Sequence, residues 1–229
     1  MIVSTAQPYF CPYPGYFARA LASDVFVILD TVQFPRGFTW ITRNRLKNDQ
    51  GTLWLSVPVW KKGLGLQKIS GVKICREGRW QRKRLESIIQ AYHHAPYLDE
   101  HFDFIEGLFS SDHETIAGMN LQSIAYIMKF LKAGTRVALL SDLGIEQRGS
   151  SLLVKICRAL SATCYLAPAS ARTYLDDDLF QAAGIELMYF KMHTPVYPQL
   201  WGNFIPNLSI FDLILNCGPK AREMVAGDK

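Results

Sequence analysis

Residues 2–34, IVSTAQPYFCPYPGYFARALASDVFVILDTVQF, decide the fold of this chain of 229 residues. The apolar segment Ile2–Ala6 predicts a short buried strand. A proline-rich turn follows, then small residues at Ala18–Ala22 that predict a helix, and a second apolar strand at Val25–Leu29. A strand, a helix and a second strand in this order are typical of the start of a parallel α/β sheet, whose ligands bind just beyond the carboxyl ends of the strands.

Polar and aromatic side chains gather at these predicted strand ends. Gln7 follows the first strand and Asp30 the second, so both are candidates to face a ligand. Three prolines between positions 8 and 14 exclude a helix there and stiffen the turn, and Gly15 permits a ligand to come close to the backbone. Tyr9 and Tyr16 flank this glycine, where they either stack on a base or sugar ring or fill the space between helix and sheet.

Charge is distributed unevenly along the chain. Residues 36–84 contain 13 Lys and Arg side chains against two acidic ones, whereas the remaining residues contain 12 cations and 18 anions. This segment therefore predicts an anionic small-molecule partner, such as a nucleotide, a nucleotide-sugar or an activated acyl donor. The alternative is a solvated basic face without a ligand.

A strand through Thr42–Arg45 would place Arg43 and Arg45 on one face, as a two-pronged clamp for phosphate or carboxylate. Further polar side chains of the same region complete the predicted ligand-binding set. They are Gln33, Asn44, Lys61 and Lys68.

The second half of the chain supplies the remaining candidates. Ser170 and Tyr174 follow the carboxyl end of a predicted strand, and His193 follows the last one, after residue 190. His193 is the predicted general acid or base, because the pKa of an unperturbed histidine lies near neutrality. Asp30 is the second predicted catalytic residue.

Strands and helices alternate again after a helical middle, which predicts one domain over residues 1–229 with a helical lobe inserted at 78–132. The expected fold class is α/β, with a Rossmann-like parallel sheet of nucleotidyltransferase type. The last dozen residues, from Gly218, are polar and are expected to fray.

Composition narrows the remaining possibilities. No apolar run approaches the length of about 18 residues that a membrane-spanning helix needs, and the start of the chain lacks the pattern of a signal peptide, so we expect a cytoplasmic protein. Five widely spaced cysteines and scattered histidines favour neither a disulfide framework nor a metal site.

Nine sequence blocks, in order along the chain, carry a resemblance to a known family. They are AQPYFCPYPGYF (6–17), DVFVILDTVQF (24–34), TRNRLK (42–47), LWLSVPV (53–59), QKISGVKI (67–74), APYLDEHF (95–102), GIELMYF (184–190), PVYPQL (195–200) and FIPNLSIFDLILNCG (204–218). On these blocks the chain resembles the WbqC-like protein family, which is associated with bacterial surface-polysaccharide gene clusters. One departure is visible at Tyr165–Arg172, where alanines replace the Ser-Gly or Gly-Gly that is usual in this loop.

The resemblance implies a transferase of O-antigen biosynthesis that moves an aminoacyl or acyl group onto an amino sugar. The sequence does not identify the cofactor, and ATP or a nucleotide-sugar with magnesium is the candidate. The alternative is a nucleotidyltransferase-like nucleotide-binding protein, although Pro14-Gly15-Tyr16 stands where adenylyl-transferring folds carry Gly-His. A third alternative, disfavoured because no nucleic-acid motif is present, is a nucleic-acid-binding protein in which the aromatics of the basic segment stack on bases.

Overall fold

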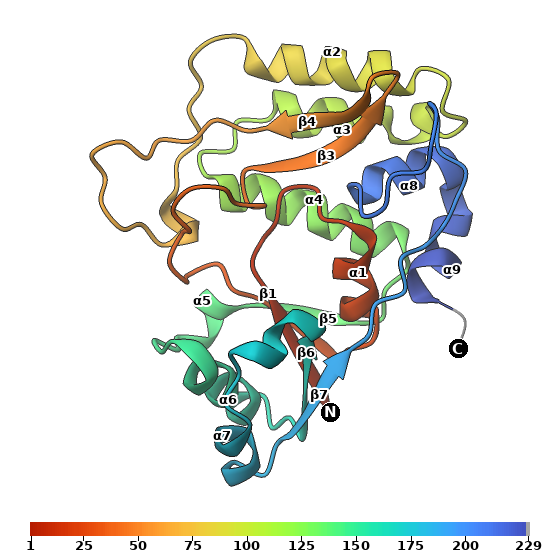
Figure 1. Ribbon diagram of the computed structural model, residues 1–229. Coiled ribbons are helices and arrows are strands. Elements are labelled where there is room, and N and C mark those ends of the chain that lie inside the picture. Colours follow the sequence, from red (N-terminus) through yellow and green to blue (C-terminus); the bar gives the residue numbers. More distant parts are fainter. Residues whose placement is uncertain (228–229) are drawn as a thin grey trace.

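The computed structural model describes residues 1–227, so the last two positions of the predicted domain lie outside the described residues. The chain is an α/β protein with one five-stranded parallel sheet, helices and a small antiparallel hairpin (Figure 1). The sheet strands are β1 (Ile2–Ala6), β2 (Val25–Ile28), β5 (Arg136–Leu139), β6 (Cys164–Pro168) and β7 (Glu186–Phe190).

The order of strands in the sheet is β5-β2-β1-β6-β7. The chain therefore builds outward from β1 in one direction through β2 and β5, and then returns to add β6 and β7 on the other side. Val3 of β1 marks the junction, because it is in register with Val25 of β2 and with Tyr165 of β6. The carboxyl ends of β1 and β6 flank the point where strand order reverses, which is where open α/β sheets bind ligands.

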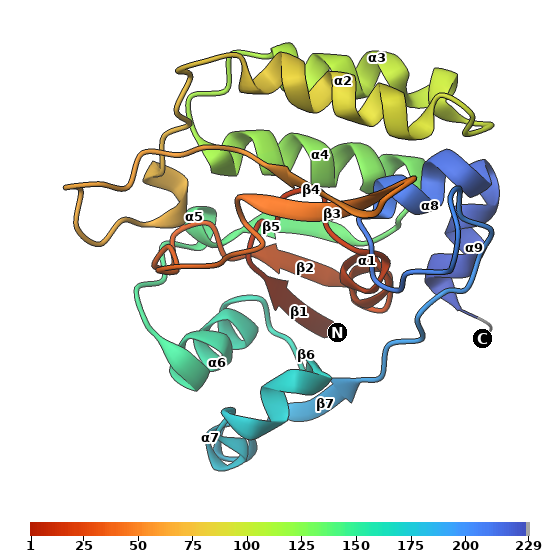
Figure 2. The same cartoon turned by 45° about the horizontal axis from the view of Figure 1, so that its top comes forward.

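The hairpin is formed by β3 (Arg43–Asn48) and β4 (Gly51–Ser56). A tight turn at Asp49–Gln50 joins them, and Gly51 closes it with a φ of 110°, a backbone conformation that other residues rarely adopt. The parallel strands point toward the hairpin, which lies between the sheet and helices α2 and α3 (Figures 1 and 2). The predicted extended segment Thr42–Arg45 thus begins β3, whereas the partner strand β4 was not predicted.

Nine helices complete the part of the fold that the structure describes. They are α1 (Pro14–Leu21), α2 (Trp80–Tyr92), α3 (Leu98–Ser110), α4 (Ile116–Phe130), α5 (Leu140–Leu143), α6 (Gly149–Ala159), α7 (Asp177–Ala182), α8 (Ile210–Cys217) and α9 (Ala221–Ala226). Short 3-10 helices lie at Ile69–Gly71, Ala169–Thr173 and Gly218–Lys220. Within residues 1–227 we find no helix with the length and hydrophobicity that crossing a bilayer requires.

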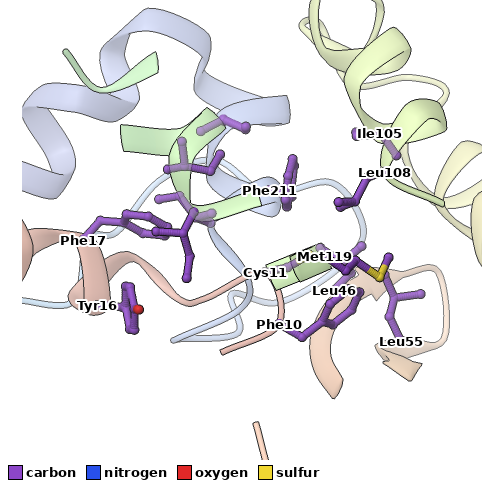
Figure 3. Close-up of a cluster of buried hydrophobic side chains, with 14 of the residues drawn as sticks. Phe10, Cys11, Tyr16, Phe17, Leu46, Leu55, Ile105, Leu108, Met119 and Phe211 are labelled. Carbon is purple, nitrogen blue, oxygen red and sulfur yellow. The ribbon is translucent and has the colours of Figure 1, made fainter. Parts of the chain in front are cut away.

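Alternate residues of the central strands supply two separate cores. Phe26 and Ile28 of β2 face the larger core, which the hairpin and helices α1–α4 and α8 complete. Val25 and Val27 face the smaller core beneath α6 and α7. Part of the larger core lies around Phe10 (Figure 3) and encloses a cavity of about 20 Å³, which is too small for a ligand.

Two sequence-based expectations about helices are wrong. The first helix begins at Pro14 and not at Ala18, because proline lacks only an N–H that the first turn of a helix leaves unpaired. The carboxyl-terminal segment from Gly218 to residue 226 is helical and not frayed, since α9 buries Ala221 and Val225 against the larger core.

Candidate functional site

Strand β3 presents its residues alternately to two sides of the hairpin. Arg43, Arg45 and Lys47 share one side, while Asn44 and Leu46 are buried on the other. The expectation that Arg43 and Arg45 share one strand face is confirmed. The sequence predicts this alternation because side chains of a strand have a period of two.

Three aromatic rings, of Phe38, Trp40 and Trp54, lie beside these cations, and we call them the aromatic cluster. The rings of Trp40 and Trp54 stack with centroids 6.0 Å apart and an interplanar angle of 23°. Phe38 stands edge-on to both, at 5.1 Å from Trp40 and 5.7 Å from Trp54. Although such rings gain free energy by burial, Phe38 is 50% exposed and Trp54 is 39% exposed.

The aromatic cluster orients the guanidinium groups of β3. The Arg43 Cζ lies 3.9 Å from the centroid of Phe38 and 5.5 Å from that of Trp54. The Arg45 Cζ lies 5.8 Å from the centroid of Trp40. Each guanidinium is attracted to the negative face of an aromatic ring, which fixes it without using its hydrogen-bond donors.

Arg43 and Lys61 form a pair of like charges, which we call the cation pair. The Lys61 Nζ lies 4.9 Å from the centroid of Phe34. Partial burial lowers the pKa of Lys61, and the positive charge of Arg43 lowers it further. Neither side chain forms an ion pair with a carboxylate within residues 1–227. An anion bound between them would relieve this repulsion.

Arg45 is tied to the segment between β7 and α8, residues 191–209, which we call the β7–α8 loop. Its Nη2 donates to the carbonyl of Asn207 at 3.1 Å and lies 3.4 Å from that of Pro206. Its Nε is buried and has no hydrogen-bond partner among the described residues. Arg45 therefore serves mainly to position the β7–α8 loop. The cation pair is then the part of the cationic face that stays available to a ligand.

Lys47 and Asp212 anchor the same loop. The Lys47 Nζ donates to the carbonyl of Asn203 at 2.6 Å. The Asp212 carboxylate accepts from the hydroxyl of Tyr92 at 2.5 Å and from that of Tyr197 at 2.8 Å. Burial raises the pKa of Asp212, whereas these two hydrogen bonds and the Lys47 charge oppose the rise.

His193 is exposed in the β7–α8 loop. Its position follows from the contacts of its chain neighbours Met192 and Thr194. Met192 packs against Gly15 in the first turn of α1. On the other side, the Thr194 hydroxyl donates to Asn207 Oδ1 at 3.4 Å, and the carbonyl of the same asparagine accepts from the β3 guanidinium described above. His193 therefore lies on a stretch of the β7–α8 loop that packs against α1 on one side and is hydrogen-bonded to β3 on the other.

A second group of predicted residues follows the carboxyl ends of β1 and β6 in the chain. Burial raises the pKa of Tyr9, and the phenols of Tyr13 and Tyr174 raise it further, whereas the charge of Arg19 opposes the rise. Tyr174 is 68% exposed, and Ser170 precedes it on the surface. Gln7 is half-buried beside them in sequence, and its side-chain amide makes no hydrogen bond within residues 1–227.

Several predicted site residues instead make structural contacts. The Asp30 carboxylate is buried and accepts from the Ser141 N–H at 3.0 Å, at the start of α5. The Tyr16 hydroxyl donates to the carbonyl of Gln7 at 3.2 Å, within the core. Gly15 is covered by Met192, so its missing side chain makes room for that side chain and not for a ligand.

Asn44 holds the proline-rich turn. Its Nδ2 donates to the carbonyls of Phe10 at 3.0 Å and Cys11 at 2.7 Å, which exhausts its donors. Gln33 and Lys68 lie opposite each other in an antiparallel bridge, and the Lys68 Nζ pairs with Glu146 at 3.0 Å. Within residues 1–227, neither of these two side chains forms a hydrogen bond or an ion pair with the cation pair.

Sequence reasoning missed two parts of this site. The sequence connects the aromatic cluster only with the nucleic-acid-binding alternative, because its three rings come from two separate segments, 38–40 and β4. The Asp212 network was not predicted, yet a carboxylate within the apolar run SIFDLIL is itself a signal of a buried polar contact.

Two comparisons with known proteins bear on this arrangement. The sequence model of the WbqC-like protein family matches residues 7–224. An uncharacterized protein of Mycobacterium tuberculosis, Rv1507c, is 31% identical over 222 residues, which cover 96% of this chain and 95% of that protein.

Proposed function

The chain belongs to the WbqC-like protein family, and from this premise we propose that it is a transferase of bacterial surface-polysaccharide (O-antigen) biosynthesis, which moves an aminoacyl or acyl group onto an amino sugar. The observation that carries the proposal is the cation pair. Arg43 and Lys61 lie together without a carboxylate partner in the described chain, which suits the phosphates of an activated donor.

We propose in addition that the sheet is of the Rossmann-like nucleotidyltransferase type. The strand order, which reverses between β1 and β6, supports this assignment. Residues 78–132 would form a helical lobe inserted within a single domain of residues 1–229, and helices α2, α3 and α4 occupy that stretch. The lobe and the hairpin lie over the carboxyl ends of the strands (Figure 1), where they help to enclose a ligand.

In the proposed reaction, the amine of the acceptor sugar attacks the activated acyl carbon of the donor. The new N–C bond forms while the C–O bond to the donor phosphate breaks, and the phosphate leaves with the electron pair. Arg43 and Lys61 stabilise the charge that develops on this phosphate. His193 takes the proton that the amine loses, a role that contributes about 10²- to 10⁴-fold to a rate.

The donor is proposed to be ATP-activated or linked to a nucleotide. Magnesium would arrive on the donor phosphates, since no carboxylate within residues 1–227 contacts the cation pair. Gln7, Tyr9, Ser170 and Tyr174 would line the crevice at the ends of β1 and β6, where the acceptor sugar could bind. Asn44 is left out of the chemistry because its amide nitrogen and oxygen are both committed to backbone partners, and Asp30 because its Oδ1 accepts from the Ser141 N–H.

Nucleotidyl transfer is the second candidate, because the cation pair serves any reaction that releases a phosphate. The two candidates differ in their products. Acyl transfer places the acyl group on the sugar amine, whereas nucleotidyl transfer leaves the amine free and places the nucleotide on another acceptor.

The test is to incubate the purified protein with magnesium-ATP, a panel of amino acids and UDP-amino sugars, and to detect N-acylated sugar and pyrophosphate. We expect acylated sugar from the unaltered protein and at least a 100-fold slower rate for Arg43→Ala and His193→Ala. Arg82→Ala is the matched control, because Arg82 is an exposed cation of α2 that pairs with Glu86 at 2.7 Å. It should retain the full rate.

Two results would decide against the acyl-transfer proposal. Pyrophosphate release that depends on Arg43, without acylated sugar, would establish nucleotidyl transfer instead. Equal rates for the unaltered protein, Arg43→Ala and His193→Ala would show that the chemistry lies elsewhere.

A further inference from the structure

We propose that the exposed Trp54 ring, with Phe38 standing edge-on beside it, forms a stacking platform for the base of a nucleoside diphosphate, and that the cation pair Arg43 and Lys61 binds its diphosphate. This inference rests on the proposed function, in which the cation pair holds phosphates. It adds new ligand-binding residues and names the chemical class of the ligand.

The first step is the exposure of the rings. Phe38 and Trp54 come from different segments, the loop after β2 and strand β4, yet they meet with centroids 5.7 Å apart and are 50% and 39% exposed. Their planes are nearly perpendicular, at 88°, so Trp54 offers the stacking face and Phe38 stands beside it as a side wall. Exposed apolar surface that gathers in one place is typical of a binding site. Trp40 backs the platform, because it stacks on Trp54 at 6.0 Å and fixes that ring in place.

The second step is the distance between rings and charges. The Arg43 Cζ lies 5.5 Å from the Trp54 centroid and 3.9 Å from that of Phe38, so a phosphate bound to this guanidinium would lie within one sugar's length of the platform. Lys61 contributes the second charge: its Nζ lies 4.9 Å from the Phe34 centroid, and partial burial together with the Arg43 charge lowers its pKa. Two cations next to a ring match a ligand with one planar base and two phosphates, whereas a neutral sugar would leave the repulsion between the cations unrelieved.

The third step is the limited length of the surface. Single-strand nucleic-acid sites combine several stacking positions with a cationic groove that follows the backbone. Here the β7–α8 loop closes one end, because Arg45 donates to the carbonyl of Asn207 and Lys47 to that of Asn203. This loop limits the length of the face next to the platform, and one platform with one cation pair suits a mononucleotide.

The test measures dissociation constants of ADP, UDP and pyrophosphate by titration calorimetry, together with quenching of tryptophan fluorescence. We expect Trp54→Leu to weaken ADP and UDP about tenfold, because stacking on an aromatic ring contributes about that factor or more, and to leave pyrophosphate within twofold. Arg43→Ala should weaken all three ligands. Trp60→Leu is the matched control, since Trp60 is 44% exposed in the same region but lies outside the aromatic cluster, and it should change none of them.

The outcomes separate this inference from the proposed function. Pyrophosphate binding that needs Arg43, with equal ADP affinity in Trp54→Leu and the unaltered protein, would overturn the platform and leave the phosphate site intact. Equal pyrophosphate affinity in Arg43→Ala and the unaltered protein, or no binding of any of the three ligands, would overturn both the platform and the phosphate site. Binding of a 15-nucleotide oligothymidylate more than 100-fold tighter than UDP, with a steep salt dependence, would replace the mononucleotide with single-stranded nucleic acid.

Discussion

The Tyr92 hydroxyl lies 2.5 Å from Asp212 Oδ2, and this contact joins α2 to α8 in the interior of the protein. The same hydroxyl accepts a hydrogen bond from the backbone N–H of Lys47 at 3.0 Å. One phenol therefore connects two helices and strand β3. The other oxygen of the same carboxylate accepts from the Tyr197 hydroxyl at 2.8 Å, so Asp212 also supports the β7–α8 loop.

Tyr92→Phe should lower the free energy of unfolding by about 1–3 kcal/mol, because it leaves the buried Asp212 carboxylate and the Lys47 N–H each short of a partner. Urea unfolding followed by circular dichroism measures the change. Tyr189→Phe is the control, since its hydroxyl bonds to the exposed Asp177. A loss in Tyr92→Phe no larger than in the control would contradict the structural role of the phenol.

His101 should make stability depend on pH. Burial lowers the pKa of this side chain below its usual 6.5, while the charge of Glu100 opposes the shift. The unfolded chain then binds a proton more readily than the folded one below pH 6.5, so the free energy of unfolding should fall as pH falls from 7 to 5, by at most about 1.4 kcal/mol per pH unit.

His101→Gln keeps a hydrogen-bonding group near the Tyr126 hydroxyl, which lies 2.6 Å from His101 Nδ1, but does not titrate. The unfolding free energy of this variant should change less with pH over the same range. Identical pH profiles for the two proteins would assign the dependence to other groups.

Gly15→Ala should destabilise the fold by about 1–3 kcal/mol, because the added methyl group would collide with the Met192 thioether and the Tyr13 ring. The double variant Gly15→Ala, Met192→Ala should recover part of the loss, which a double-mutant cycle of thermal unfolding would detect. Gly107→Ala is the control: nothing lies within 4 Å of its added methyl group, so in helix α3 it should stabilise. A cycle without coupling would mean that the loop does not rest on α1.

The five thiols should differ sharply in reactivity. Cys11, Cys157, Cys164 and Cys217 are buried and only Cys75 is half-buried. Burial also raises the pKa of Cys11 and raises that of Cys157 to about 12, which suppresses the reactive thiolate. Ellman's reagent should therefore modify one thiol per native chain and five in urea, and Cys75→Ser should abolish the native reaction. Rapid modification of Cys11 in the native protein would refute the packing around Phe10 shown in Figure 3.

Local patterns predicted much of this fold. The apolar run at Ile2–Ala6 is β1 with the predicted bounds, and the stretch 78–132, predicted to be helical, contains helices α2, α3 and α4. Both signals are local, because a buried strand or a one-sided helix needs its pattern of apolar residues whatever its partners are. Hairpin strand β4 escaped prediction, since its pairing with β3 depends on contacts that its own residues do not encode.

The sequence by itself determined the parallel sheet, the basic character of residues 36–84 and the alternation that puts Arg43 and Arg45 on one side of a strand. Period, charge and chain order are properties of the chain alone. Only the tertiary structure decided which polar groups remain available to a ligand. It committed Asp30 and Asn44 to backbone partners, and it left Arg43 and Lys61 together without a carboxylate in the described residues. Hydrogen-bond satisfaction and charge pairing depend on residues far apart in sequence, so packing alone could separate the structural side chains from those that face a ligand.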